Sequence, residues 1–187
     1  KLALMPAAQN RTKESVSPAQ MQKLVRAIAR VYDYVIVDCP AGIETGFKTA
    51  IAAAREAIIV TTPEISAVRD ADRVIGLLEA SDIKKQYLLV NRLKPAMVQA
   101  DQMMSVADVQ EILAIPLLGV IPDDERVIVS TNRGEPLVLD EKLSLAGVAF
   151  DNIARRLGGE KVPFLDLTAA HDNLFSRLRR FLGGSSR

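Results

Sequence analysis

The sequence has one cysteine among its 187 residues, Cys39. A single thiol cannot form an internal disulfide or a four-cysteine zinc site, and it fits a reducing compartment. Net charge is nearly absent as well, because 24 Lys and Arg residues stand against 23 Asp and Glu residues, a formal charge of +1. No overall field therefore draws the whole chain to nucleic acid or to an anionic membrane, so any such attraction must be local.

Long apolar segments are also missing. No apolar run reaches the roughly 18 residues that span a bilayer, and residues 1–6 are too short for the apolar region of a secretory signal. We therefore expect a protein that is soluble or peripheral to a membrane. The composition, 49% hydrophobic and 25% charged, excludes a disordered or collagen-like chain. It predicts one compact domain that buries roughly 70% of its unfolded surface.

What the sequence does contain is an alternation of two hydrophobic patterns. Short apolar runs predict strands covered on both faces, at residues 34–38, 57–62, 87–91 and 116–121. Helical spacing occurs at residues 18–31, 44–54, 66–80, 105–113 and 144–157. Ser17 before Pro18 predicts an N-cap, and Ser105 with Asp108 predicts a capping box. The alternation predicts an α/β fold, with a mostly parallel sheet and helices on both faces.

Polar residues follow the apolar runs, at the edge where such sheets bind ligands. The four runs lead into Asp38, Glu64, Asn91 with Arg92, and Pro122 with Asp123 and Asp124. A carboxylate that ends a buried strand before a Pro/Gly turn is how P-loop nucleotide hydrolases hold Mg²⁺, usually through water. Asp38 has that spacing. Spacing alone equally allows Asp38 to be a loop carboxylate that caps the next helix.

Three strings of residues narrow this choice, at positions 38–46, 61–73 and 134–136. They closely resemble the MinD family of septum-site-determining ATPases, part of the deviant Walker A group that also contains the ParA partition proteins. The first two strings are specific to MinD proteins, and the resemblance extends over nearly the whole chain. It implies a P-loop NTPase fold, ATP and Mg²⁺ as ligands, and ATP hydrolysis in the full-length protein.

The sequence departs from this family in one respect that bears on mechanism. The family's Gly-rich phosphate loop is absent, because Gly42 is the first glycine and no Gly-Lys-Ser/Thr occurs anywhere. The family places that loop after its first strand, upstream of everything in this chain. We therefore expect an amino-terminally truncated domain, consistent with a first residue of Lys1 in place of Met. We expect this chain alone to be inactive as an ATPase.

The resemblance assigns roles to the residues that end the strands. Asp38 matches the aspartate that positions Mg²⁺ through water, and Gly42 belongs to the second switch, which senses the γ-phosphate. Asn91 matches the residue that hydrogen-bonds the adenine edge, with Arg92 beside it, and Pro122 and Asp123 belong to the same base pocket. The alternative for Asn91 and Arg92 is a polar strand exit that satisfies loop backbone groups.

The predicted helix at residues 66–78 is amphipathic. Val68, Ile75 and Leu78 can face the sheet, whereas Arg69, Asp70, Asp72 and Arg73 stay outside, where mixed charges are ordinarily just solvated. The resemblance adds a second interpretation, because the matching face of MinD proteins lies at the ATP-dependent dimer interface where MinC and MinE dock. The partner-surface candidates are Glu44, Glu64, Ser66, Asp70, Asp72 and Asn132.

The chain ends in a basic, aromatic-bearing segment. Its apolar residues follow the spacing of one helical face and are Leu174, Phe175, Leu178, Phe181 and Leu182; the basic residues Arg177, Arg179 and Arg180 occupy the rest, with Asp172 as an N-cap. This pattern predicts an amphipathic membrane-targeting helix. The alternative is a terminal helix packed on the domain. The expected organisation is therefore a domain at 1–157, a linker at 158–171 and a tail at 172–187.

The resemblance also implies a cycle and a place in the cell. ATP would dimerise the protein, the dimer would sit on the membrane, MinC would be recruited, and MinE would stimulate hydrolysis and release. This implies a cytoplasmic protein on the inner face of the cell membrane, or on a plastid's inner envelope. The rivals are another ATPase of the same group, for DNA partition or flagellar number, and a non-catalytic interaction module. His171 and Cys39 have no partner in the sequence that would make either catalytic.

Overall fold

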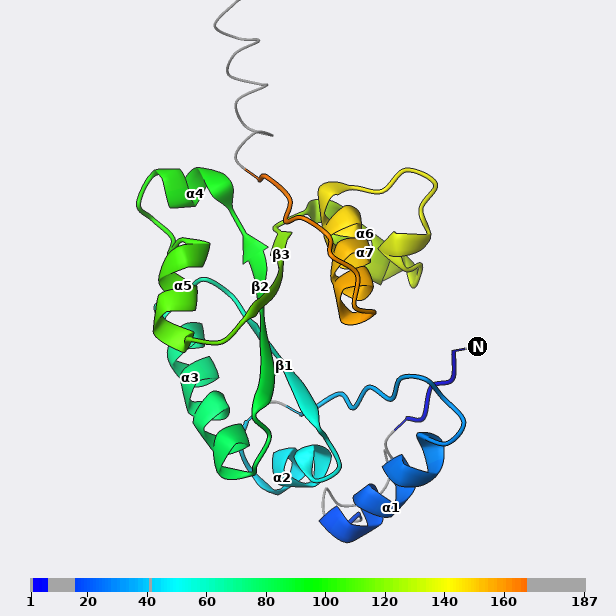
Figure 1. Cartoon of the computed structure of the whole chain (residues 1–187). Helices are drawn as coiled ribbons and strands as arrows, with labels where there is room; N and C mark the ends of the chain where they lie inside the picture. The colour runs from blue at the N-terminus through cyan, green and yellow to red at the C-terminus, as the bar shows by residue number, and fades with distance from the viewer. Residues whose placement is uncertain (1, 7–15, 41, 168–187) are drawn as a thin grey trace, which may run out of the picture. The chain divides into compact units, whose positions relative to one another are not determined.

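The computed structural model describes residues 2–6, 16–40 and 42–167 (Figure 1). The expected end of the linker and the whole membrane tail lie outside the described residues. The chain divides into two compact units. The first comprises Lys1–Ala57 with Leu78–Lys85, and the second comprises Ile58–Leu77 with Gln86–Arg187.

The element order confirms the predicted α/β class. It runs α1 (Pro18–Ile28), α2 (Thr45–Ile51), β1 (Glu56–Thr61), α3 (Ile65–Ala80), β2 (Lys85–Leu93), α4 (Pro95–Gln99), α5 (Val106–Leu113), β3 (Leu117–Pro122), α6 (Glu125–Arg133), η1 (Leu137–Leu139) and α7 (Leu145–Leu157). The described strands form one sheet in the order β1-β2-β3, and β2 pairs with β3 in parallel. The elements α4, α6 and η1 were not predicted; α4 and η1 have too few residues to show a clear period, whereas the nine residues of α6 were missed.

The core of the second unit is built on both faces of β2. Leu88 and Val90 are fully buried, as are Val68 of α3 and Val109 of α5. Leu89 belongs instead to a cluster with residues of β3, η1 and α7. Neighbouring residues of a strand point to opposite faces, so β2 is covered by helices on both sides. In Figure 1, α3 and α5 lie on one side of the strands and α7 lies on the other.

The packing of α7 on β3 depends on one glycine. A Cβ atom at Gly119 would lie 2.3 Å from Cγ1 and 2.7 Å from Cδ1 of Ile153, far inside van der Waals contact. The missing side chain therefore lets α7 approach the strand closely. This position is a strand glycine whose role is set by a neighbouring element, as strand glycines often are.

Both helix starts predicted from the sequence are confirmed. The Ser17 hydroxyl accepts from the Gln20 N–H at 3.3 Å, and the Gln20 side chain accepts from the Ser17 N–H, with Pro18 in the first turn. Ser105 and Asp108 form the second capping box, at 3.1 Å and 2.8 Å. The hydrogen bonds with Ser105 lower the pKa of Asp108, because they favour its charged form.

The strand expected at residues 34–38 is not formed. This segment is irregular, with Ile36 85% exposed and Tyr34 69% exposed. An apolar run becomes a strand only when another strand accepts its backbone hydrogen bonds, and no described strand pairs with this one. The expectation that every strand is covered on both faces was also wrong for β1, where Ile58 and Val60 are exposed.

The first unit has a small core of its own. Phe47 and Ala50 of α2 are buried, and the Gln22 side chain of α1 donates to the Ala52 carbonyl at 2.9 Å. An ion pair of 2.6 Å joins Lys85 to Glu56. No residue of α1 is buried, so the amphipathic pattern that predicted this helix does not correspond to a covered face in the described residues.

Candidate functional site

Four of the predicted site residues come together where β2 and β3 end. Val90 pairs with Val120 and Leu93 pairs with Pro122, so Asn91 and Arg92 lie beside the end of β3. The Asp123 N–H donates to the Leu93 carbonyl at 2.9 Å and closes this edge. The predicted base-pocket set of Asn91, Arg92, Pro122 and Asp123 is therefore contiguous in the second unit.

Asp123 joins two cations at this edge. Its Oδ1 lies 3.3 Å from Nε of Arg92, and its Oδ2 lies 3.3 Å from Nζ of Lys94. Partial burial opposes ionisation, but hydrogen bonds from Arg92 and Lys94 outweigh it and lower the pKa of Asp123 below its usual value. Sequence reasoning missed Lys94. The only available signal was a lysine directly after an apolar run, which is common on any surface.

Asn91 and Arg92 have an unusual local conformation. Arg92 has φ of +57°, the left-handed region that residues with a Cβ seldom adopt. Its N–H donates to Oδ1 of Asn91 at 2.9 Å. Oδ1 of Asn91 thus accepts a backbone hydrogen bond, as the interpretation of a polar strand exit expects. Hydrogen bonding of the same side chain to adenine stays a prediction.

An open groove lies next to this edge in the second unit. It includes two predicted partner residues, Glu64 and Ser66, together with the cations Arg92 and Lys94. The rest of its lining comes from the start of α3 and from the segment around α4, and consists of Pro63, Ile65, Arg69, Met97, Asp101, Gln102, Met103, Met104 and Asp108. The three methionines were not predicted as groove residues, because a methionine in a short helix or loop carries no specific sequence signal.

The remaining partner candidates of this unit lie on two other surfaces. Asp70 and Asp72 are exposed on α3, and Asp70 forms a long ion pair of 3.8 Å with Arg73. The predicted inward residues Val68 and Ile75 are buried, so the amphipathic assignment of α3 is confirmed. Asn132 is exposed on α6 and does not line the groove.

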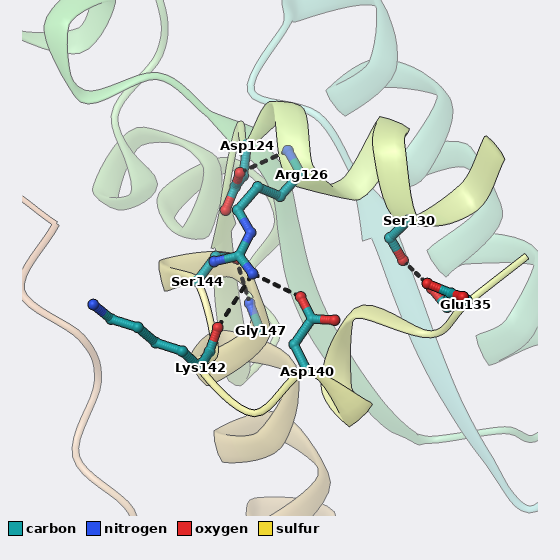
Figure 2. A network of polar contacts seen from close by, with 8 residues as sticks. All are labelled: Asp124, Arg126, Ser130, Glu135, Asp140, Lys142, Ser144 and Gly147. Carbon is teal, nitrogen blue, oxygen red and sulfur yellow. Dashed lines mark hydrogen bonds and ion pairs between the residues drawn. The ribbon is translucent and has the colours of Figure 1, made fainter. Parts of the chain in front are cut away.

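A polar network holds α6 and η1 against the start of α7 (Figure 2). Arg126 reaches the Asp140 carboxylate at 2.7 Å and the Lys142 carbonyl at 3.2 Å, and Asp124 caps α6 by accepting from the Arg126 N–H at 2.9 Å. Asp124 also accepts from Ser144 and from the Ala146 N–H at the start of α7. Burial opposes its ionisation, yet these hydrogen bonds lower the pKa of Asp124.

The predicted catalytic residues Asp38 and Gly42, and the partner candidate Glu44, lie in the first unit. Asp38 is exposed at the end of the unpaired apolar segment, Gly42 has φ of +91°, and Glu44 is the N-cap of α2 without a side-chain cap bond. Desolvation first, and then the adjacent Asp38 charge, raise the pKa of the Cys39 thiol. A raised pKa disfavours the thiolate, the nucleophilic form, which agrees with a non-catalytic Cys39.

Two negative findings hold for the described ranges only. They contain no cluster of three or more His, Cys, Asp or Glu side chains that could hold a metal ion. A lone carboxylate such as Asp38 still fits Mg²⁺, which commonly keeps several waters and takes only one or two protein carboxylates. Among the same residues, no helix combines the length and the apolar character needed to cross a bilayer.

Comparison with known proteins gives consistent matches. The family model described as ParA, NUBPL iron-transfer P-loop NTPase, matches residues 15–158. The septum site-determining protein MinD of a Synechocystis strain is 62% identical over 184 residues, 98% of this chain and 69% of that protein. A solved MinC:MinD cell division protein complex from Aquifex aeolicus matches with a TM-score of 0.76 and 46% identity, over 80% of this chain and 62% of the solved chain.

One further solved structure includes a nucleotide. The septum site-determining protein MinD of Pyrococcus horikoshii, complexed with Mg-ADP, matches with a TM-score of 0.66 and 28% identity, over 75% of this chain and 56% of the solved chain. In all three proteins a substantial part of the relative, about a third or more, has no counterpart in this chain.

Proposed function

The chain belongs to the ParA family of P-loop NTPases and, within it, to the MinD septum site-determining proteins, and we propose that it forms part of an ATPase that positions the division septum. The observation that carries this proposal is the 62% identity to a MinD protein over 98% of the chain.

We propose that the edge of β2 and β3 binds the base of ATP. The donors and acceptors there suit a purine edge, because Asn91 offers a side-chain amide and Pro122 offers an apolar surface beside it. Asp38 would hold Mg²⁺ through water. The backbone of Gly42 would approach the γ-phosphate closely, because glycine has no side chain. The bound ion would neutralise charge on the phosphates. Asp123 is engaged by Arg92 and Lys94 at this edge.

The first test asks which part of the protein hydrolyses ATP. The full-length protein, meaning this sequence preceded by the family's phosphate-loop portion, should hydrolyse ATP, and Asp38→Asn should reduce turnover by at least tenfold. This chain alone should show no turnover, because it has no Gly-rich loop to hold the β- and γ-phosphates. Turnover by the isolated chain, or an unaffected Asp38→Asn variant, would contradict these assignments.

We propose that Asp70 and Asp72, with Glu64 and Ser66, contact MinE and MinC at an ATP-dependent dimer interface. Asp70→Lys with Asp72→Lys should abolish stimulation of the full-length ATPase by MinE while leaving unstimulated turnover in place. Glu79→Lys, on the same helix and also exposed, is the control for a carboxylate-to-lysine change elsewhere on α3. Equal stimulation of the double variant and the control by MinE would refute the assignment of α3 to the interface.

We propose further that the tail at 172–187 anchors the ATP-bound dimer to an anionic membrane. Its four arginines and one aspartate give it a charge of +3, and its five apolar residues have the spacing that predicts one helical face. The free energy lost in ordering such a short helix is about as large as the free energy gained by burying its apolar face. Membrane binding by one tail is therefore weak, whereas two tails linked in a dimer bind firmly. Phe181→Glu should prevent ATP-dependent co-sedimentation with anionic vesicles, whereas Ser186→Glu should retain most of it.

A second candidate function applies to the isolated chain. The groove and the exposed face of α3 need no phosphate loop, so the chain could act as a non-catalytic interaction module. Titration with a fluorescent ATP analogue separates the two cases. Binding by full-length protein and none by this chain would leave the isolated chain with interaction surfaces only.

A further inference from the structure

β2 carries one extra residue where it ends. Between the pairs Val90–Val120 and Leu93–Pro122, β2 has two residues and β3 has one, which is a β-bulge. The two bulge residues are Asn91 and Arg92. Bulges of this kind re-aim a side chain, and they are frequent next to functional sites. The register irregularity therefore coincides with the residue proposed to meet the base.

The bulge needs a stabilising contact. Arg92 adopts φ of +57°, where its Cβ crowds its own backbone, a conformation that costs an ordinary residue free energy and costs glycine nothing. Asp123 supplies two contacts across the bulge: its N–H donates to the Leu93 carbonyl at 2.9 Å, and its Oδ1 lies 3.3 Å from Nε of Arg92. Asp123 is thus the residue that holds the bulge from the neighbouring strand.

A hydrogen bond from the Arg92 backbone fixes the orientation of the Asn91 side chain. The Arg92 N–H donates to the Asn91 side chain at 2.9 Å, and only the carbonyl oxygen of an amide can accept that bond. Oδ1 therefore faces the backbone, which leaves the Nδ2 amino group as the part of the side chain that can donate to a ligand. A released Arg92 backbone would let the amide rotate and present either end.

We propose that Asp123 is a positioning residue for base recognition, acting through the left-handed Arg92 to hold the Asn91 amide with its amino group toward the ligand. This differs from a direct contact of Asp123 with the base, the role that the family resemblance implies. Both of its oxygens are already engaged, one by Arg92 and the other by Lys94. The inference rests on the proposed function, namely that this edge binds the base of ATP.

A matched set of variants separates a backbone role from a side-chain role. Arg92→Ala loses the ion pair and disfavours φ above zero, whereas Arg92→Gly loses the same ion pair but adopts that φ freely. Asp123→Ala removes the side-chain contact with Arg92 and keeps the backbone hydrogen bond to Leu93. Lys94→Ala removes only the ion pair between Lys94 and Asp123 and leaves the ion pair between Arg92 and Asp123. The readout is the ratio of the Kd for ITP to the Kd for ATP, measured on full-length protein.

The expected pattern is specific. The Asn91 amino group would donate to N1 of adenine, which accepts a hydrogen bond, whereas N1 of hypoxanthine carries a hydrogen and cannot accept one. Asp123→Ala and Arg92→Ala should therefore lower the ratio of the Kd for ITP to the Kd for ATP by about tenfold, the effect of one well-placed hydrogen bond. Arg92→Gly should lower it clearly less than Arg92→Ala does, and Lys94→Ala should leave it within about twofold. A merely structural defect would weaken the binding of both nucleotides equally and leave the ratio of the two Kd values unchanged. An unchanged ratio in all four variants, or the same loss in Arg92→Gly as in Arg92→Ala, would overturn the proposal.

A ligand-free measurement keeps this inference separate from the proposed function. In this chain without nucleotide, hydrogen exchange at the Arg92 amide should be slow in the unmodified protein and in Arg92→Gly, and faster in Asp123→Ala. Failure of full-length protein to bind ATP would refute the base site. Equal exchange rates in unmodified protein and Asp123→Ala would refute the positioning role even if ATP binds.

Discussion

Two runs of this chain, residues 34–38 and 87–91, share one pattern: a tyrosine, three aliphatic residues and a polar end. The second run lies in β2, where Leu88 and Val90 are 0% exposed and its polar end forms a bulge tied to the next strand. The first run is irregular, with Ile36 85% exposed, and its polar end, Asp38, is exposed as well. Almost the same local sequence thus gives a core strand in one place and an exposed segment in another.

The difference lies in the neighbours and not in the runs themselves. β2 is flanked by β1 and β3, which accept its backbone hydrogen bonds, and helices cover both of its faces. The run at residues 34–38 has no strand beside it among the described residues. An apolar run therefore can form a strand, but it does so only when a neighbouring strand pairs with its backbone.

The largest expected effect contrasts the two runs directly. Leu88→Ala should lower the free energy of unfolding by roughly 2–5 kcal/mol, because it leaves a cavity in a closed core. Ile36→Ala, which removes the same kind of side chain from an exposed position, should change it by less than about 0.5 kcal/mol. Urea unfolding followed by circular dichroism suits a chain that has no tryptophan. Equal losses would mean that residues 34–38 are packed in solution.

The next effect tests the close approach of α7 to β3. Gly119→Ala should cost about 1–3 kcal/mol, since the new Cβ collides with Ile153. In a background with Ile153→Ala the same change should cost much less, which a double-mutant cycle on unfolding free energies measures. The control is Gly76→Ala on α3, where a Cβ meets nothing within 4 Å and a helix favours alanine. A penalty at Gly119 that persists without the Ile153 side chain would contradict the steric explanation.

A smaller effect concerns pH and the carboxylate that follows β3. The pKa of Asp124 is lowered in the fold, so its stabilisation is complete above the unfolded value of about 4 and is lost as pH falls below that value. Asp124→Asn keeps an N-cap side chain but removes the charge. The stability difference between the unmodified protein and Asp124→Asn should therefore shrink between about pH 4 and pH 2. A difference that stays constant over this range would show that the charge contributes nothing.

The smallest expected effect is at the polar end of the exposed run. Asp38→Ala should leave the unfolding free energy of this chain within about 0.5 kcal/mol, because the side chain lies exposed on an unpaired segment. Measured against Leu88→Ala in the same titration, this result would separate a functional carboxylate from a structural one. A clear loss of stability would place Asp38 in a packed environment.

The features that the sequence predicted well are those set by residues close together in the chain. The capping boxes at Ser17 and Ser105 formed as expected, because each joins groups three residues apart. The buried face of α3 was predicted by its spacing, since helical residues three and four apart share one face. The grouping of Asn91 with Asp123 was implied by the family resemblance, and in the structure both lie where the neighbouring parallel strands β2 and β3 end.

By itself, the sequence determined the α/β class and most of the helices, because these follow from local periodicity and caps. Only the tertiary structure decided which apolar run became a strand, how close α7 comes to Gly119, and that Lys94 joins Asp123. The chain is nearly neutral overall. Only the tertiary structure places two cations, Arg92 and Lys94, beside the carboxylate of Asp123 at the β2–β3 edge. These outcomes depend on groups far apart in the chain, whose distances no local pattern encodes.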